Sequence, residues 1–203
     1  MYLTYLLASV LGYLLGSFPT GYLVGRLMAG VDVRKIGSGR TGGSNVLRSA
    51  GKTAGLVTIF GDIGKGTLAV ILARLIFPDE PAAFALAALF SVVGHNHSIF
   101  LKFKGGAGTM TAGGALLGLD PLTLGLTVII PITLTYITRT TSIGSLLATA
   151  IGLLLGSVLI WQNYLPDAYF IFLIPVFLLS WETHRPNIRR LMAGNERRIG
   201  KKT

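Results

Sequence analysis

"IGSLLATAIGLLLGSVLIW", residues 143–161, is a run of 19 residues without a charged side chain. As a helix this run would be roughly 28 Å long, close to the roughly 30 Å hydrocarbon core of a bilayer. It therefore predicts a membrane-spanning helix. Six further apolar segments flank it, of which 107–119 is short for a full crossing: 2–27, 53–77, 82–101, 107–119, 121–138 and 166–182. Together they predict one all-α domain, residues 1–203, built as a bundle of about seven membrane-spanning helices.

The composition supports a membrane protein over a soluble one. The mean hydropathy is +0.65, and 51% of the 203 residues are hydrophobic while only 13% are charged. The absence of cysteine excludes disulfides, thiolate metal sites and a cysteine nucleophile. The net charge of +10 could indicate nucleic acid, but the hydropathy makes membrane topology, anionic lipid and an anionic substrate better explanations.

Every second connection of this predicted bundle is rich in lysine and arginine. The first, third and fifth connections and the C-terminal tail, 183–203, are rich in cations, whereas Asp79, Glu80, Asp120 and Asp167 occupy the others. Because cation-rich connections stay in the cytoplasm, this pattern predicts an external N-terminus and a cytoplasmic C-terminus, the parity of seven spans. The cations on the predicted cytoplasmic side are Arg26, Arg34, Lys35, Arg40, Arg48, Lys52, Lys102, Lys104, Arg139, and seven residues of the tail.

Three polar stretches are not explained by spanning a membrane. They are "IGSGRTGGSNVLR" at 36–48, "GHNHSIFLKFKGGAG" at 94–108 and "THRPNIRRLMAGNE" at 183–196. The predicted topology puts all three at the cytoplasmic face, together with Ser142 beside Arg139. This shared location predicts one composite site.

The first stretch has the chemistry of an anion-binding loop. Gly37, Gly39 and Gly42 form GxGxxG, but a Rossmann fingerprint needs a preceding strand, which this chain does not offer. Glycines still let backbone N–H groups converge on an anion, and Arg40 or Arg48 can bind phosphate with two parallel hydrogen bonds. The alternative is a flexible loop whose arginines only set topology.

The other two stretches also have two interpretations each. Lys104, Gly105 and Gly106 precede a helix-like run whose first N–H groups could hold an anion, or the lysine could simply anchor at the interface. His95 and His97 have no nearby acid to complete a metal site, so a structural hydrogen bond is expected of His95 and no metal is predicted.

Within the second apolar segment, Asp62 and Lys65 could be functional or could pair with each other.

In the third stretch, His184 and Asn187 are three residues apart and would share a helix face. The histidine could accept or donate a proton near neutral pH. The alternative is a basic juxtamembrane tail attracted to anionic lipid, for which the arginines alone would suffice.

The ordered set of motifs resembles the bacterial acyl-phosphate-dependent glycerol-3-phosphate acyltransferases, the PlsY family. The resemblance rests on "LLGSFPTGYLVGR", "GSGRTGGSNVLR", "GDIGKG", "GHNHSIFLKFKGGAG" and "HRPNIRRLMAGNE", which extend over nearly the whole chain. It implies transfer of a fatty acyl group from acyl phosphate to the 1-hydroxyl of glycerol-3-phosphate. The product is lysophosphatidic acid in phospholipid biosynthesis, made without cofactor or metal by a multi-pass enzyme of the bacterial plasma membrane. The oligomeric state is not implied.

The resemblance also implies roles for individual residues. Ser38 and Arg48 match a serine and an arginine that handle phosphate, and His184 and Asn187 match a third-motif pair followed by Glu196. Ser38, Arg48, His184 and Asn187 are the expected catalytic residues. The expected substrate-binding residues are Gly37, Gly39, Arg40, Asn45, Lys104, Gly105, Gly106 and Ser142. The proton acceptor could be His184 or the acyl phosphate itself.

This chain departs from the family pattern at a phosphate ligand. Ala107 stands where the family usually has a lysine, and Arg40 stands where it usually has asparagine. We hypothesise that Arg40 restores the missing cation, because both positions belong to loops predicted on the same face. Two alternatives stay open: a family member that has lost or changed its activity, and a transporter of an anionic metabolite.

Overall fold

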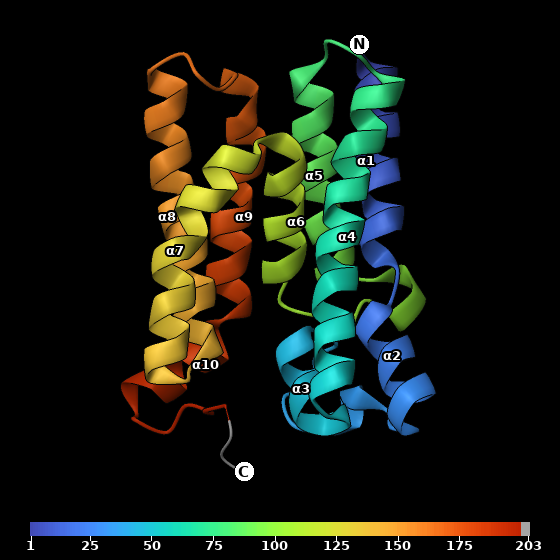
Figure 1. Ribbon diagram of the computed structural model, residues 1–203. Helices are drawn as coiled ribbons and strands as arrows, with labels where there is room; N and C mark the ends of the chain where they lie inside the picture. The colour runs from blue at the N-terminus through green and yellow to red at the C-terminus, as the bar shows by residue number, and fades with distance from the viewer. Residues whose placement is uncertain (200–203) are drawn as a thin grey trace.

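The computed structural model describes residues 1–199, in which all regular structure is helical (Figure 1). Three short 3-10 turns, η1 to η3, join or extend the α-helices. The elements in chain order are α1 (Tyr2–Ser17), α2 (Thr20–Ala29), η1 (Val33–Lys35), α3 (Gly43–Ala50), α4 (Lys52–Ile76), α5 (Pro81–Asn96), η2 (Ile99–Leu101), α6 (Thr109–Leu119), α7 (Pro121–Thr138), α8 (Thr141–Trp161), η3 (Asp167–Tyr169), α9 (Phe170–Thr183) and α10 (Arg185–Met192).

Each of the seven predicted apolar segments contains helix, which confirms an all-α bundle. Five stretches of the described chain are long and apolar enough to cross a membrane. They are Tyr2–Ala29, α4, Pro81–Leu101, α7 and α8. With 11 and 14 residues, α6 and α9 are shorter than a full crossing requires. Seven crossings therefore stay a prediction.

The first apolar segment is broken in the middle, at Phe18-Pro19, as a proline inside a helix predicts. The break leaves backbone carbonyls without helical partners, which is costly inside a bilayer. Two side chains from other segments satisfy them: Ser98 Oγ donates to the Ser17 carbonyl at 2.5 Å, and Lys65 Nζ donates to the Phe18 carbonyl at 3.1 Å. Pro131 and Pro175 lie inside α7 and α9, which continue as helix.

The helices form two groups with α6 between them (Figure 1). α1, α4 and α5 pack together in one group, and α7, α8 and α9 make the other. Small residues allow close approach of α1 and α5, because a Cβ on Gly12 or Gly16 would strike the backbone of Ala87 or Ser91.

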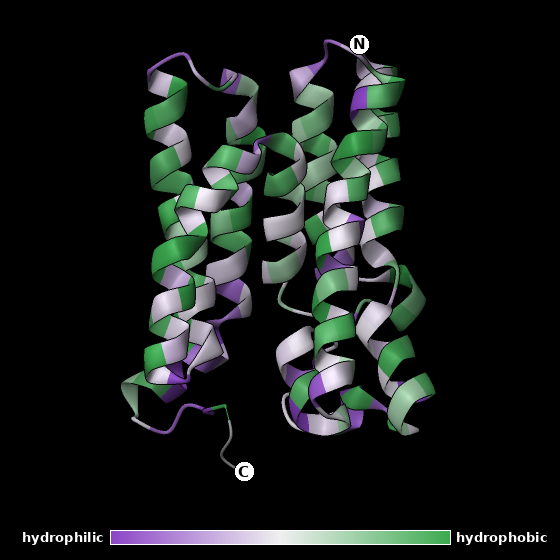
Figure 2. Cartoon of the chain, in the orientation of Figure 1, coloured by the Kyte–Doolittle hydropathy of each residue, from purple (hydrophilic) through white to green (hydrophobic). Residues whose placement is uncertain are grey.

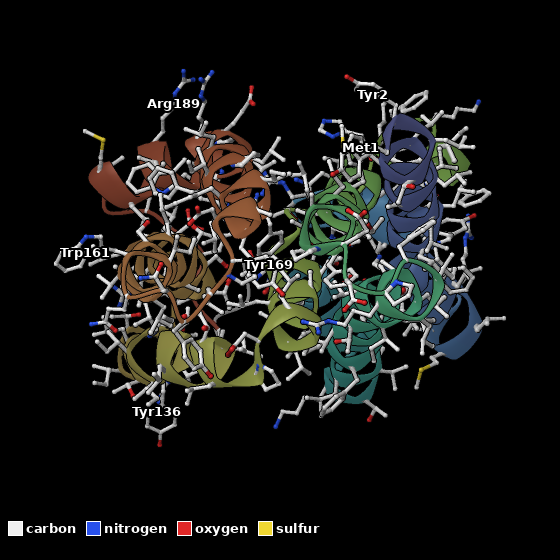
Figure 3. All side chains as sticks on the ribbon, turned by 90° about the horizontal axis from the view of Figure 1, so that it is seen from above. Met1, Tyr2, Tyr136, Trp161, Tyr169 and Arg189 are labelled. Atoms are coloured by element: carbon white, nitrogen blue, oxygen red, sulfur yellow. The ribbon has the colours of Figure 1, made fainter. Side chains whose placement is uncertain are left out.

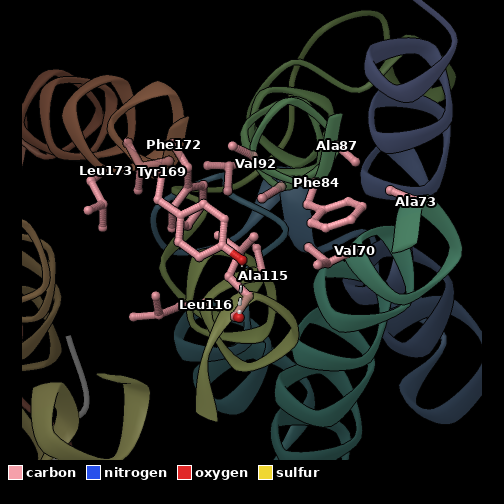
Figure 4. Close-up of a cluster of buried hydrophobic side chains, with 14 of the residues drawn as sticks. Val70, Ala73, Phe84, Ala87, Val92, Ala115, Leu116, Tyr169, Phe172 and Leu173 are labelled. Atoms are coloured by element: carbon pink, nitrogen blue, oxygen red, sulfur yellow. Dashed lines mark hydrogen bonds between the residues drawn. The ribbon is translucent and has the colours of Figure 1, made fainter. Parts of the chain in front are cut away.

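A buried apolar cluster joins the two groups (Figure 4). Phe172 and Leu173 of α9 meet Val70 of α4, Phe84 of α5 and Ala115 of α6 in this cluster. Tyr169 lies between the groups when the molecule is viewed along the helices (Figure 3). Arg74 crosses the same seam, since its Nη2 donates to the Leu119 carbonyl at 2.7 Å and to Tyr169 Oη at 3.1 Å.

The outer surface of the bundle is apolar, the inverse of a soluble protein. Large side chains such as Tyr136 and Trp161 are 85% and 83% exposed and point away from the bundle (Figure 3). Polar residues lie instead in the connections at both ends and are most extensive at the end with α3 and α10, which we call the polar end (Figure 2). Met1 lies at the opposite end from α10 (Figure 1). The predicted site residues lie at the polar end.

Candidate active site

A cavity of about 110 Å³ opens among the loops and helix ends at the polar end of the bundle. It is lined by all three polar stretches and by the start of α8. Seven of the predicted site residues line it: Ser38, Arg40, Asn45, Arg48, Ser142, His184 and Asn187. The other five, Gly37, Gly39, Lys104, Gly105 and Gly106, are not among the lining residues.

Asn45 holds the first loop in shape. Its Nδ2 donates to the carbonyls of Val33, Ile36 and Arg40 at 2.8, 3.1 and 2.9 Å, and its Oδ1 accepts from the Ser38 amide at 2.9 Å. The side chain is 2% exposed. Its polar atoms are therefore used within the protein, and Asn45 sets the position of Ser38.

The glycines of this loop serve the same geometry. Gly37 and Gly39 adopt φ of +62° and +72°, a region that side chains with a Cβ rarely enter. At Gly37 a Cβ would also meet Asn45 Oδ1. The two glycines shape the backbone around Ser38 without facing the cavity themselves.

The second glycine loop packs against the end of α5. The Gly105 amide donates to the Asn96 carbonyl at 3.1 Å, and the Gly106 amide donates to the His95 carbonyl at 3.0 Å. A Cβ on Gly106 would strike the His95 imidazole. Both predicted substrate-binding amides are therefore engaged within the protein, and Lys104 is exposed outside the cavity. Ala107, by contrast, lines the cavity.

Three helices begin at the cavity wall, namely α3 at Gly43, α6 at Thr109 and α8 at Thr141. The first N–H groups of a helix have no intrahelical partner and carry partial positive charge, which favours anions. Two hydroxyls at the cavity, Ser142 Oγ and Thr109 Oγ1, are buried and have no hydrogen-bond partner within residues 1–199. The cavity thus offers several unoccupied donors to a ligand.

Three guanidinium groups reach this cavity, from Arg40, Arg48 and Arg197. Arg40 donates to the Thr183 carbonyl and Arg197 to the Gly37 carbonyl, the latter at 3.5 Å. The Arg48 side chain makes no hydrogen bond to any described residue, and its Nε is buried. None of the three pairs with a carboxylate in the described part of the chain.

Burial is the main cause that lowers the pKa of Arg40 and Arg48, the positive charges of Arg190 and Arg197 lower it further, and the negative charge of Glu196 opposes them in part. A bound anion would relieve this repulsion. The sequence analysis missed Arg197, which comes directly after the third polar stretch. The only sequence signal for Arg197 was its position next to Glu196, the acidic residue that follows the third-motif pair.

One nitrogen of the His184 imidazole has a hydrogen-bond partner within the protein. Its Nδ1 lies 2.8 Å from the Ser180 carbonyl, a contact that requires a proton on Nδ1 and leaves Nε2 as the acceptor. Burial lowers the pKa of His184 below its ordinary value of 6.5. The residue is 4% exposed and lines the cavity. His184 can therefore accept a proton through Nε2.

Asn187 and the end of the chain are joined through Glu196. Asn187 Nδ2 donates to Glu196 Oε1 at 2.9 Å, and Arg190 Nε donates to Glu196 Oε2 at 2.8 Å. The carboxylate therefore fixes the Asn187 side chain at the cavity wall and ties the residues after α10 to that helix.

A buried ionic cluster lies on the membrane side of the cavity. Lys65 Nζ and His95 Nδ1 lie 2.9 and 3.4 Å from Asp62 Oδ1. Asp62 is 1% exposed and Lys65 is 8% exposed. Both charges are therefore buried, where an isolated charge would be very costly. Of the two interpretations of Asp62 and Lys65, the structure shows the pairing. His95 supports the second loop through its ring and carbonyl, and no cluster of three or more His, Asp or Glu residues within 1–199 could hold a metal.

The comparisons with known proteins agree with this architecture. The family model described as glycerol-3-phosphate acyltransferase matches residues 6–194. The glycerol-3-phosphate acyltransferase 2 of Moorella thermoacetica is 42% identical over 199 residues, covering 98% of this chain and 100% of the relative. The glycerol-3-phosphate acyltransferase 1 of Deinococcus radiodurans is 45% identical over 206 residues, covering 100% and 99%.

Two solved structures of PlsY, an integral membrane glycerol 3-phosphate acyltransferase, are similar throughout. The glycerol 3-phosphate form has a TM-score of 0.86 at 33% identity and covers 96% of this chain and 95% of that one. The lysophosphatidic acid form has a TM-score of 0.84 at 32% identity, with the same coverage. Matches of this extent establish the assignment: the chain belongs to the glycerol-3-phosphate acyltransferase family.

Proposed function

We propose that this protein transfers a fatty acyl group from acyl phosphate to the 1-hydroxyl of glycerol-3-phosphate. The observation that carries the proposal is the set of cations at the cavity: Arg40, Arg48 and Arg197 line it without a carboxylate partner among the described residues, because the two carboxylates that also line it, Asp62 and Glu196, pair with Lys65 and Arg190. Both substrates carry phosphate, which guanidinium groups and helix N-termini bind well. The family assignment supplies glycerol-3-phosphate as the acceptor.

The reaction needs little covalent help because acyl phosphate is already activated. The 1-hydroxyl oxygen of glycerol-3-phosphate attacks the acyl carbonyl carbon, and a new ester C–O bond forms. The C–O bond to phosphate breaks, and inorganic phosphate leaves with the bonding electrons. The hydroxyl proton goes either to His184 Nε2 or to the departing phosphate. The site therefore works mainly by alignment and by stabilising negative charge.

Within this reaction, Ser38, Arg40 and Arg48 bind phosphate, while His184 and Asn187 orient glycerol-3-phosphate. Ser142 Oγ, buried without a partner within 1–199, supports its assignment as a substrate contact. We assign Asn45 and the glycines at 37, 39, 105 and 106 to positioning, because their polar groups or backbone shape the two loops. Lys104 lies outside the cavity, and its role stays a prediction.

Arg40 takes over the charge of the lysine that Ala107 replaces. Both residues line the same cavity, which supports the exchange. Ile59 and Met110 also line the cavity, and they provide an apolar path toward the lipid for the acyl chain of the donor.

The bundle crosses the bacterial plasma membrane seven times, with its N-terminus outside and its active site at the cytoplasm. The opposite placement of Met1 and α10 supports an odd number of crossings, and the cations near α10 support a cytoplasmic location.

The test is acyl transfer by the purified protein in detergent, with palmitoyl phosphate and glycerol-3-phosphate as substrates. We expect lysophosphatidic acid and inorganic phosphate in equal amounts, and no product from Ser38→Ala or His184→Ala. Folded protein that forms product only after Ala107→Lys would mean a family member that has lost its activity. Flux of glycerol-3-phosphate into vesicles without product would indicate a transporter instead.

A further inference from the structure

The residues after α10 fold back over the polar end of the bundle. Gly194 has φ +70°, which turns the chain, and the Asn195 amide donates to the Arg190 carbonyl at 2.9 Å. The Ile199 amide then donates to the Arg139 carbonyl, at the turn between α7 and α8, at 2.8 Å. Residues 193–199, which we call the C-terminal cap, thus run from α10 across to α7 and α8.

Two residues of this cap, Glu196 and Arg197, line the active-site cavity, and Arg197 is the cationic one. It lines the cavity together with Arg40 and Arg48, and its Nη2 approaches the Gly37 carbonyl at 3.5 Å. Gly37 directly precedes Ser38, so Arg197 lies beside the loop assigned to phosphate.

The surroundings of Arg197 do not explain its charge. Its neighbour Glu196 is occupied by Asn187 and Arg190, and no described carboxylate lies within 4.0 Å of Arg197. Two further guanidinium groups line the same small cavity, so the three cations repel one another when the site is empty. A doubly charged phosphate placed among them would turn this repulsion into attraction.

We propose that Arg197 is a substrate-binding residue, which contributes a third guanidinium group to the phosphate of a bound substrate and is delivered to the cavity by the C-terminal cap. This inference rests on the proposed function for the identity of the substrate. The phosphate can belong to acyl phosphate or to glycerol-3-phosphate, and the two are separated by which KM changes.

A purely structural role for Arg197 makes a different prediction. If its only task were to hold the cap through the Gly37 carbonyl, a neutral side chain that donates a hydrogen bond could take its place without loss of substrate binding. Arg197→Gln keeps a donor and removes the charge, whereas Arg197→Lys keeps the charge. Arg198→Gln is the matched control, since Arg198 is the exposed neighbour in the same cap and does not line the active-site cavity.

The experiment measures KM for both substrates, inhibition by inorganic phosphate and thermal stability for the wild type and the three variants. Arg197→Gln should raise at least one KM and the inhibition constant of phosphate about 10- to 100-fold, as expected for loss of one charged hydrogen bond. Arg197→Lys should recover much of the loss, and Arg198→Gln should behave as the wild type. The melting temperature of Arg197→Gln should change little.

Wild-type KM values and wild-type phosphate inhibition in Arg197→Gln would overturn the inference. If Arg197→Gln unfolds, the decision falls to Arg197→Ala reconstituted in lipid, measured against Arg198→Ala. Unchanged phosphate binding by that Arg197→Ala protein would also overturn the inference. Should the wild type make no lysophosphatidic acid, the proposed function fails by itself. The binding of inorganic phosphate, followed by calorimetry in the wild type and Arg197→Gln, then still decides whether Arg197 is a phosphate ligand.

Discussion

Asn187 and Glu196 are joined by a hydrogen bond of 2.9 Å, and the same carboxylate accepts from Arg190 at 2.8 Å. One acidic side chain thus positions a proposed substrate-binding residue and fastens the C-terminal cap to α10. The structure in this region depends on a single carboxylate with two partners.

Glu196→Ala should lower kcat/KM and the stability of the cap together. The Glu196 side chain is 7% exposed, and its removal leaves Asn187 and Arg190 without their partner, at a cost of about 1–3 kcal/mol. Enzyme kinetics and thermal denaturation measure the two effects. Glu182→Ala, at an exposed position near the end of α9 without an ion-pair partner in the described chain, is the control. Equal behaviour of the two variants would contradict this role of Glu196.

His184 should titrate below pH 6.5 and carry its proton on Nδ1 when neutral. Burial disfavours the charged imidazole, so the folded protein binds this proton less readily than the unfolded chain does. The contribution of His184 to stability is then full above pH 6.5, and it is lost as pH falls from there toward the lowered pKa. Activity should fall over the same acidic range if Nε2 accepts the proton. Nitrogen NMR of labelled histidine, with His97→Gln to aid assignment, tests this, and a titration at or above 6.5 would refute it.

Arg40→Asn should raise KM for a phosphate-bearing substrate by about tenfold or more, because a charged hydrogen-bond donor is lost. Adding Ala107→Lys to that variant should restore part of the affinity, since both positions line one cavity. The measurement is a double-mutant cycle on kcat/KM. Unchanged kinetics in Arg40→Asn would show that Arg40 does not compensate for Ala107.

Gly106→Ala should reduce activity and destabilise the protein by about 1–3 kcal/mol, as overpacking does in tight sites. The added Cβ would strike the His95 imidazole and push the second loop off α5. Gly125→Ala in α7 is the matched control, because a Cβ there meets no atom within 4 Å and alanine favours helix. Thermal denaturation and kcat/KM should separate the two variants; equal stability would argue against this account of Gly106.

Asp62→Asn should destabilise the bundle by about 3–5 kcal/mol, because Lys65 would be left as an unpaired buried charge. The double variant Asp62→Asn, Lys65→Met removes both charges and should recover part of that loss, although the Phe18 carbonyl then loses its Lys65 donor. Unfolding in mixed micelles with increasing denaturing detergent can compare the three proteins. A double variant as unstable as Asp62→Asn alone would mean that the charge pair is not the cause.

The apolar segments predicted the helices well because helix in a bilayer is set by local composition. The break at Pro19 has a local cause, since a proline removes a helical hydrogen bond, although α7 and α9 continue as helix through Pro131 and Pro175. The partners of that break were not predictable from the sequence, because Lys65 is 47 residues from the Phe18 carbonyl that it satisfies. Such contacts depend on which helices pack together, which no local pattern encodes.

The candidate site was predicted in the same uneven way. Residue types with free charges or hydroxyls, such as Arg48 and Ser142, line the cavity as expected. Asn45, Gly105 and Gly106 also offer polar groups, but these are engaged by Val33, Asn96 and His95 within the protein. The motif pattern marks both sets and does not distinguish a group that faces the substrate from one that supports it.

The pairing of Asp62 with Lys65 has a consequence for how the protein is made. The two residues are three apart on α4, so their charges can neutralise each other as soon as that helix forms. A newly synthesised α4, whose other charges, Lys52 and Arg74, lie in its first and last turns, can thus enter the lipid from the translocation machinery with its central charges paired, before α5 brings His95 to the cluster. Biogenesis of this enzyme then does not require the charged helix to wait for its partners.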